Sequence, residues 1–301
     1  MGFTYGVSSW TYGAEDLATT AARVADAGLD GLEVAGWLDR FTPADVLDIC
    51  GRHGLAVLSV CGMMRLRPGG PDLSSPHPGE RAAAIDYYLG LCDFTAAVGA
   101  ALIVCTPQPV FKNQPTQPAS TVEELRAHHD AEWAWCAESL SIIARRASEL
   151  GLAIALEPIN RYEGHLVSTV AEGLAMADAV GNPAVGVHLD TYHMNIEEAD
   201  PCASVARAAG RIRNVHVADN HRLTVGTGHF DFAGFIVALK AAGYDGSIVV
   251  ETLPRFPNFD LAAEAWTASE RDVDVRNSVD YLRRLEARDL DPVTASAPGS
   301  A

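Results

Sequence analysis

Eight short apolar segments recur along the chain, each followed by a longer amphipathic stretch, and this alternation constrains the fold most strongly. Short apolar runs rich in β-branched residues are typical of strands buried on both faces of a parallel sheet. Eight strand–helix units close a parallel barrel with no edge strand left over, so we predict an α/β fold, a (β/α)8 TIM barrel. The expected strands are Phe3–Ser9, Asp30–Val34, Leu55–Cys61, Ala101–Cys105, Leu152–Glu157, Ala184–Asp190, Ile212–Val217 and Ser247–Glu251.

The stretches between these strands carry helix signals, and most of them end just before a glycine, which favours the left-handed conformation that terminates helices. Thr42 is a suitable N-cap because Pro43 follows it at the first helical position. The expected helices are Leu17–Ala27, Pro43–His53, Glu80–Val98, Val122–Leu150, Val170–Val180, Pro201–Ala209, Phe232–Ala242 and Val275–Leu285.

With 301 residues, 48% of them hydrophobic, the chain can bury one large core. No block of proline, glycine and serine resembles a linker, so we assign residues 1–289 to a single catalytic barrel domain. The last segment, residues 290–301, reads LDPVTASAPGSA. It is small and polar, and we expect it to be disordered.

The formal net charge of −17 opposes binding to nucleic acid and to anionic membrane surfaces. No run of about 18 apolar residues is present, and the first ten residues lack the features of a signal peptide. The six cysteines show no CxxC spacing and are expected to be buried free thiols in a reducing compartment. These features predict a cytoplasmic enzyme with a small-molecule substrate and neither nucleic acid nor membrane as partner.

Four consecutive expected strands in the second half end on a side chain that can bind metal: Glu157, Asp190, His216 and Glu251. The carboxyl ends of barrel strands form the rim on which active sites are built. Three carboxylates and one imidazole favour one divalent ion, Mn²⁺ first, with Mg²⁺ or Co²⁺ as alternatives. Two further positions of an octahedral ion would remain for two adjacent substrate oxygens. The alternative is that Asp190 only caps the next helix and that His193, three residues later, is a surface residue of a loop.

Four segments carry a resemblance to a known family: ALEPINRYEGH, HLDTYHMNIEE, VHVADNHRLTVGTG and VVET. They resemble the ketose 3-epimerases, typified by the D-tagatose and D-allulose (psicose) 3-epimerases, within the xylose-isomerase-like barrels. The resemblance is sharp from about Leu152 to Glu251. It implies that Glu157, Asp190, His216 and Glu251 bind the metal, and that Glu163, His193 and Arg222 hold substrate oxygens. It also implies a homo-oligomer, a dimer or a tetramer.

The resemblance further implies that Glu157 and Glu251 are the catalytic acid and base. Inverting a carbon beside a ketone requires proton removal from one face and proton return to the other, through a metal-bound cis-enediolate. Two bases on opposite sides of the substrate are therefore needed, and the fifth and eighth strands can supply them. The expected activity is C3 epimerisation of a free ketose sugar.

Other residues have two interpretations each. His188 points to the same barrel face as Asp190, one layer deeper, and we expect a hydrogen-bonded core histidine in preference to a metal ligand. Glu33 either supports the site or forms a structural salt bridge. Trp10, Phe111 and Phe256 either line the sugar pocket or pack in the ordinary way. Gly226 and Gly228 either surround a phosphate or form a tight turn, and we favour the turn.

Four other functions remain open. A DNA-repair endonuclease of the related barrel family would need extra metal ligands, but the third and fourth strands end at Cys61 and Cys105. An isomerase of hydroxypyruvate, inosose or a sugar phosphate, and a lyase similar to C-glycoside deglycosidases, would use the same proton abstraction. A sugar-binding protein would not need both glutamates.

Two loops depart from the family's pattern. The segment Thr106–Ser120 contains four prolines and is expected to be an irregular lid or pocket wall. The segment after Glu251, TLPRFPNFD, also differs from the family. Both are expected to face the part of the substrate away from the metal, so the sequence predicts the chemistry better than the sugar.

Overall fold

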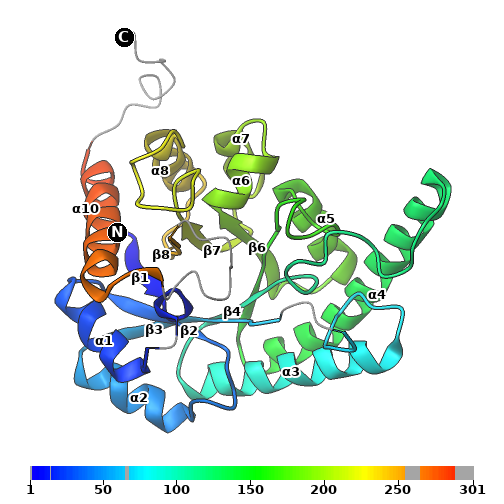
Figure 1. The fold of residues 1–301 in the computed structure, drawn as a ribbon, viewed down its shortest axis with the longest axis horizontal. Coiled ribbons are helices and arrows are strands. Elements are labelled where there is room, and N and C mark those ends of the chain that lie inside the picture. The colour runs from blue at the N-terminus through cyan, green and yellow to red at the C-terminus, as the bar shows by residue number, and fades with distance from the viewer. Residues whose placement is uncertain (1, 14, 65–67, 255–264, 289–301) are drawn as a thin grey trace.

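Eight parallel strands form a closed barrel in the computed structural model, which describes residues 2–13, 15–64, 68–254 and 265–288. The strands pair in chain order, and β8 closes the ring by pairing with β1. Helices surround the strands as an outer layer (Figure 1). The predicted TIM barrel is therefore confirmed, with all eight expected strands present. The expected tail, residues 290–301, lies outside the described residues.

The strands lie within one or two residues of their expected limits. They are β1 (Thr4–Ser8), β2 (Gly31–Ala35), β3 (Ala56–Cys61), β4 (Leu102–Cys105), β5 (Ala153–Leu156), β6 (Val185–Asp190), β7 (Ile212–Val217) and β8 (Ser247–Val250). The helices are η1 (Ser9–Tyr12), α1 (Leu17–Asp26), α2 (Pro43–Arg52), α3 (Pro78–Ala97), α4 (Val122–Glu149), α5 (Val170–Val180), α6 (Thr191–Glu197), α7 (Pro201–Arg207), α8 (Phe232–Ala241) and α10 (Ala268–Glu286).

The helix starts follow local capping chemistry. Thr42 caps α2 in a capping box with Asp45, as its position before Pro43 predicted. Helix α10 begins seven residues earlier than expected, at Ala268, because Thr267 and Glu270 form another capping box. Helix α6 was not expected as a separate element. No helix in the described part of the chain has the length and apolar character needed to cross a bilayer.

Strand register brings the functional side chains to one rim. Asp190 at the end of β6 pairs directly with His216 on β7. Glu157 and Glu251 each follow the last residue of their strands, β5 and β8. The β6–β7 register shifts between Val187 and His188, just below this level. The barrel therefore presents these side chains at the carboxyl ends of four neighbouring strands.

Candidate active site

The four expected metal ligands lie together at the rim. Glu157, Asp190, His216 and Glu251 each offer one ligand atom, and these atoms all lie within 4.8 Å of one another. All four residues are buried, and none is more than 6% exposed. Concentrating three carboxylates away from water is costly unless a cation compensates their charge. The donor set therefore fits a hard divalent cation.

His216 is held by Glu33, a residue of β2 on the far side of the barrel. A Glu33 carboxylate oxygen lies 2.9 Å from His216 Nε2, and Ser59 and Asn214 donate hydrogen bonds to the same carboxylate. The other imidazole nitrogen, Nδ1, is buried without a well-aligned hydrogen bond and lies 3.1 Å from Glu251 Oε1. A carboxylate that fixes one histidine nitrogen while the other faces a cluster of acids is typical of metal sites. This arrangement favours a supporting role for Glu33.

The two candidate catalytic glutamates differ in their electrostatic surroundings. Burial raises the pKa of Glu157 well above its ordinary value, and the charge of Glu251 adds to the effect. Burial also acts to raise the pKa of Glu251, but the charge and close contact of His216, together with the charge of Arg222, lower it below its ordinary value. Burial lowers the pKa of His216, yet the charges of Glu33 and Glu251 outweigh it and raise that pKa. The barrel interior thus shifts the pKa values of these two neighbouring carboxyls in opposite directions.

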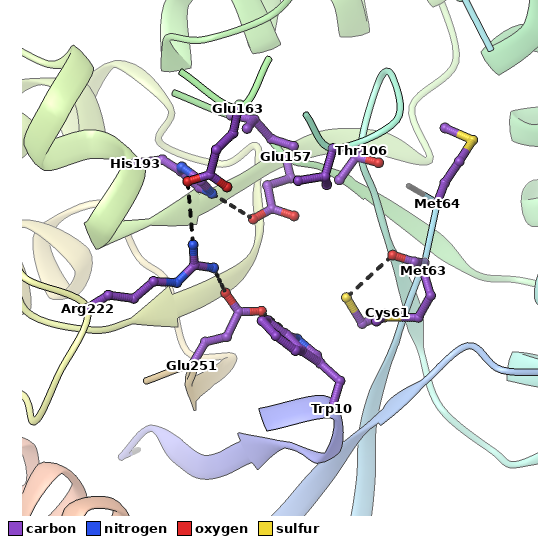
Figure 2. A pocket seen from close by; sticks show the side chains of 13 residues that line it. Trp10, Cys61, Met63, Met64, Thr106, Glu157, Glu163, His193, Arg222 and Glu251 are labelled. Carbon is purple, nitrogen blue, oxygen red and sulfur yellow. Dashed lines mark hydrogen bonds and ion pairs between the residues drawn. The ribbon is translucent and has the colours of Figure 1, made fainter. Parts of the chain in front are cut away.

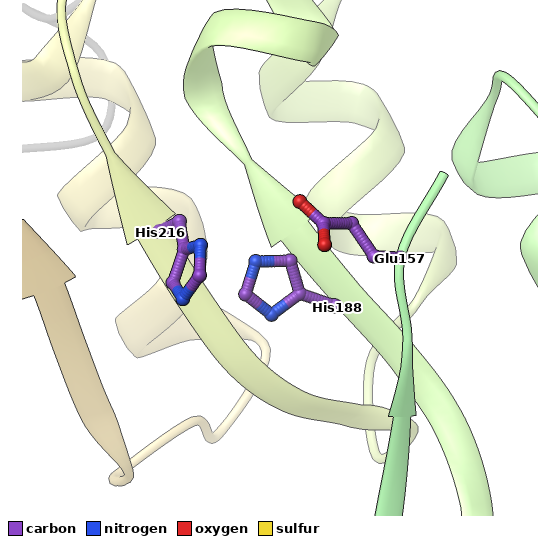
Figure 3. Close-up of side chains that lie close together, drawn as sticks. All are labelled: Glu157, His188 and His216. Carbon is purple, nitrogen blue, oxygen red and sulfur yellow. The ribbon is translucent and has the colours of Figure 1, made fainter. Parts of the chain in front are cut away.

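His188 lies beneath this cluster, between Glu157 and His216 (Figure 3). Its ring meets that of His216 edge to face, with centroids 4.1 Å apart. Burial, followed by the charge of His216, lowers the pKa of His188 well below its ordinary value. Neither ring nitrogen has a hydrogen-bond partner among the described residues. The expected core position is observed, but the expected hydrogen bonds are not.

A pocket with an empty volume of about 490 Å³ opens above the cluster. Figure 2 shows the carboxylates of Glu157 and Glu251 entering it from different strands, with Cys61 and Met63 on the far wall. Glu33, His188 and Phe111 are not among its lining residues. Those lining residues are Trp10, Cys61, Gly62, Met63, Met64, Thr106, Val110, Glu157, Ile159, Glu163, His193, Arg222 and Glu251.

His193 is buried in the pocket wall, so the alternative of a surface histidine is wrong. Its Nδ1 accepts a hydrogen bond from the backbone nitrogen of Asn160, and the side-chain nitrogen of Asn160 lies 2.8 Å away. These contacts place the proton of a neutral His193 on Nε2, which lies 3.8 Å from Glu157 and 3.7 Å from Asp190. His193 can therefore donate to a substrate oxygen. Sequence reasoning missed Asn160, although it lies within the EPIN segment.

Asp190 both caps a helix and belongs to the candidate metal site. Its Oδ1 accepts the backbone hydrogen of Tyr192 and caps α6, while Asp190 also contributes an oxygen to the ligand cluster. A carboxylate has two oxygens and several lone pairs, so capping and metal binding do not exclude each other.

Arg222 occupies the opposite wall in a left-handed backbone conformation, with φ of 62°. It donates to Glu251 Oε2 at 3.1 Å and lies 3.7 Å from Glu163 Oε1 (Figure 2). Its guanidinium carbon stands 4.5 Å from the centre of the Tyr192 ring. Tyr192 was also missed, because an aromatic residue inside HLDTYHMN gives no signal that distinguishes support from packing. Arg222 is thus oriented on two sides and faces the pocket.

Gly226 and Gly228 surround a carboxylate of the protein instead of a phosphate. Their backbone nitrogens donate to Asp219 at 2.9 and 2.8 Å, and those of Asn220 and Phe230 donate to the same side chain. A Cβ added at Gly228 would lie 2.0 Å from the side-chain oxygen of Asn220. The favoured interpretation, a tight turn, agrees with this geometry.

The segment 106–120 is irregular, as expected, and a buried lysine within it forms ion pairs with residues outside it. Lys112 is 4% exposed, and its Nζ lies 2.6 Å from Asp72 and 2.7 Å from Glu132. This anchoring agrees with a pocket wall, to which Thr106 and Val110 contribute. Phe111 is 38% exposed and does not line the pocket, so the first of its two interpretations, a pocket contact, is not observed.

Trp10 both lines the pocket and donates a hydrogen bond from Nε1 to Glu251 Oε1 at 2.8 Å. It therefore orients one of the two glutamates as well as forming a wall. Phe256 and most of the TLPRFPNFD segment lie outside the described residues.

Comparisons with known proteins agree with the geometry. The model of the xylose isomerase-like TIM barrel family matches residues 21–285. The L-ribulose 3-epimerase of Mesorhizobium japonicum is 32% identical over 257 residues, which cover 82% of this chain and 80% of that protein. The ketose 3-epimerase of Arthrobacter globiformis is 32% identical over 247 residues, covering 81% and 80%.

A solved structure is similar as well. The crystal structure of the Methylomonas D-allulose 3-epimerase in complex with D-allulose superposes with a TM-score of 0.79 at 27% identity, covering 94% of this chain and 97% of that one. The family match spans most of the barrel, and the two relatives named above cover most of both sequences. This chain belongs to the xylose isomerase-like TIM barrel family and, within it, is an isomerase of the ketose 3-epimerase group.

Proposed function

We propose that this enzyme inverts C3 of a free ketose, with Glu157 and Glu251 exchanging the proton. The observation that carries the proposal is that both carboxylates line one pocket and that both belong to a four-residue set of candidate metal ligands. The relatives' names supply the reaction type, since they are L-ribulose and ketose 3-epimerases. The first sugars to test are therefore small ketoses.

The surroundings shift the pKa values of the two glutamates in opposite directions, as such a reaction needs. The lowered pKa of Glu251 suits it to accept the C3 proton from one face of the sugar, and the raised pKa of Glu157 suits it to return a proton to the other face. The reverse reaction exchanges the two roles. Trp10 and Arg222 hold the two oxygens of Glu251, and so fix the direction from which it reaches the substrate.

Glu157, Asp190, His216 and Glu251 would hold one divalent cation, which we propose to be Mn²⁺ because carboxylate oxygens dominate the set. When bound, such a cation supplies Lewis-acid stabilisation of the negative charge that develops beside a ketone. Glu33 orients the imidazole of His216 for this role through its contact with Nε2.

Substrate hydroxyls would meet three polar side chains. His193 donates from Nε2, Arg222 donates from its guanidinium, and Glu163 accepts. These groups line the same pocket as the two glutamates, so they can orient the ketone end of a sugar. The opposite wall, with Met63, Val110 and their neighbours, is apolar and would face the distal carbons.

A sugar phosphate is the less favoured substrate. The amides of Gly226 and Gly228, which were the candidate phosphate donors, are used by Asp219. Lys112 is buried between Asp72 and Glu132 instead of facing the pocket. Among the described lining residues, Arg222 is the only cation, and it is already paired with Glu251.

The decisive experiment follows free ketoses by NMR in D₂O with Mn²⁺-loaded protein, using fructose, allulose, tagatose, sorbose and ribulose. We expect deuterium at C3 together with a new epimer. The matched control is Glu251→Gln, which keeps the shape of the side chain and removes its basicity, and it should abolish both signals. Exchange that ends in an elimination product would replace the epimerase with a lyase, and the absence of exchange with every ketose would refute the proposal.

A further inference from the structure

The side chain of His188, on β6, is fully buried. Neither ring nitrogen has a hydrogen-bond partner among the described residues. A buried polar group without a partner opposes folding, so packing alone gives no reason for an imidazole at this position.

His188 is within reach of two members of the ligand cluster. Glu157, His188 and His216 each offer an atom that lies within 4.8 Å of the others, and Figure 3 shows the ring of His188 between them. This set of three shares Glu157 and His216 with the four-residue set at the rim. It lacks Asp190 and Glu251, and it replaces their oxygens with a second imidazole nitrogen.

We propose that His188, Glu157 and His216 form a second, deeper position for a divalent cation, selective for Zn²⁺ and Cu²⁺. Imidazole nitrogen suits Zn²⁺ and Cu²⁺, whereas carboxylate oxygen suits Mn²⁺ and Mg²⁺. The rim position has three carboxylates and one imidazole, and the deeper position has two imidazoles and one carboxylate. This inference rests on the proposed metal centre. It adds that the centre has two positions, which prefer different divalent ions.

The two positions exclude each other because they share two ligands. An ion in the deeper position leaves Asp190 and Glu251 without a metal, and Glu251 remains bonded to Trp10 and Arg222. His188 does not line the pocket, so such an ion is set back from the substrate. Zn²⁺ would therefore inhibit by occupying the shared ligands in a position that does not support turnover.

The test uses direct metal binding to the metal-free protein. Dissociation constants for Mn²⁺ and Zn²⁺ are measured by chelator competition, and the nitrogens bound to Cu²⁺ are counted by electron paramagnetic resonance. The variants are His188→Phe, which keeps an aromatic ring, and His188→Gln in case the first does not fold. His193→Phe is the matched control, because His193 is near the cluster but belongs to neither ligand set.

We expect Cu²⁺ bound by two imidazoles in the unmodified protein and in His193→Phe, and by one in the His188 variants. Zn²⁺ affinity should fall by about tenfold or more in these variants, whereas Mn²⁺ affinity should change by less than about threefold. One imidazole on Cu²⁺ in the unmodified protein, or equal losses for Mn²⁺ and Zn²⁺, would overturn the proposal.

The outcome is separable from that of the proposed function. A protein that binds Cu²⁺ through two imidazoles but exchanges no ketose proton with Mn²⁺ would retain this inference and lose the epimerase assignment. A protein that epimerises a ketose but binds Cu²⁺ through one imidazole would retain the epimerase assignment and lose this inference.

Discussion

Glu33 Oε1 lies 2.9 Å from His216 Nε2, although the two residues are 183 positions apart in the sequence. The contact spans the barrel interior and leaves His216 Nδ1 directed toward Glu251, 3.1 Å away. Ser59 and Asn214 also donate to Glu33, so they hold its carboxylate in the position from which it orients the imidazole. Orientation of this proposed ligand therefore depends on the opposite half of the barrel.

Replacing Glu33 with Gln should weaken binding of Mn²⁺ by about 10- to 100-fold, the usual effect of removing a partner that orients a metal ligand. Affinity is measured by titration calorimetry of the metal-free protein. Ser59→Ala is the milder control, since it removes one of the hydrogen bonds that hold Glu33 and should have a smaller effect. Unchanged Mn²⁺ affinity in Glu33→Gln would mean that the contact is purely structural.

Stability of the metal-free protein should fall as the pH rises above about 6.5. The folded-state pKa values of His216 and Glu157 are raised above their ordinary values of 6.5 and 4.5, so both groups hold protons in the folded protein that the unfolded chain has released. Their contribution is complete below the unfolded pKa and is lost as the pH rises through the folded pKa. The lowered pKa of Glu251 acts only at lower pH, because its contribution is fully present above about 4.5.

The pH dependence of metal binding has the opposite sign. A cation must displace the proton of His216 from the nitrogen that binds it and competes with the proton of Glu157, so Mn²⁺ affinity should rise with pH and binding should release protons. Thermal melts with and without Mn²⁺ between pH 6 and 9, with calorimetry in two buffers of different ionisation enthalpy, measure both effects. Equal heats in the two buffers would show that no proton is displaced.

The positions of the proposed ligands were predictable because each follows an apolar run, and barrel strands place their carboxyl ends at one rim. Glu157, Asp190, His216 and Glu251 could be selected from sequence for this reason. The contacts that orient them could not, since Trp10 and Glu251 are 241 positions apart and only the closed barrel joins them.

The remaining differences have local causes. Helix α6 is so short that its periodicity gives no signal, and its N-cap is the same Asp190 that belongs to the ligand cluster. Phe111 was a candidate for the pocket because it is aromatic, but its backbone has a left-handed φ of 76°, the neighbouring Lys112 is anchored by Asp72, and the side chain lies partly in solvent. Backbone conformation of this kind is not encoded in residue type.

Lys112→Met should destabilise the protein by about 3–5 kcal/mol, because removing one partner of a buried ion pair leaves the other charges uncompensated. Lys112 Nζ contacts Asp72, Glu132 and Ser74 within 2.8 Å, and all four side chains are buried. Denaturant unfolding gives the free energy. The control is Arg146→Ala, whose ion pair with Asp93 is exposed and should contribute at most about 1 kcal/mol. Similar losses in both variants would show that burial of the Lys112 cluster has no energetic consequence.

Tyr192 should act on substrate binding through Arg222. The guanidinium carbon lies 4.5 Å from the ring centre, and Arg222 also bonds to Glu251 and approaches Glu163. A desolvated cation–π contact contributes about 1–2 kcal/mol, so Tyr192→Leu should raise KM by roughly 5- to 30-fold. Tyr192→Phe keeps the aromatic face and should change KM by less than about twofold.

Arg222→Ala should raise KM at least as much as Tyr192→Leu, and combining the two changes should add little, because the ring acts only through the guanidinium. Steady-state kinetics on the sugar that shows C3 exchange would measure these effects. If the fold-changes in KM of the two single variants multiply in the double variant, Tyr192 contacts the substrate directly.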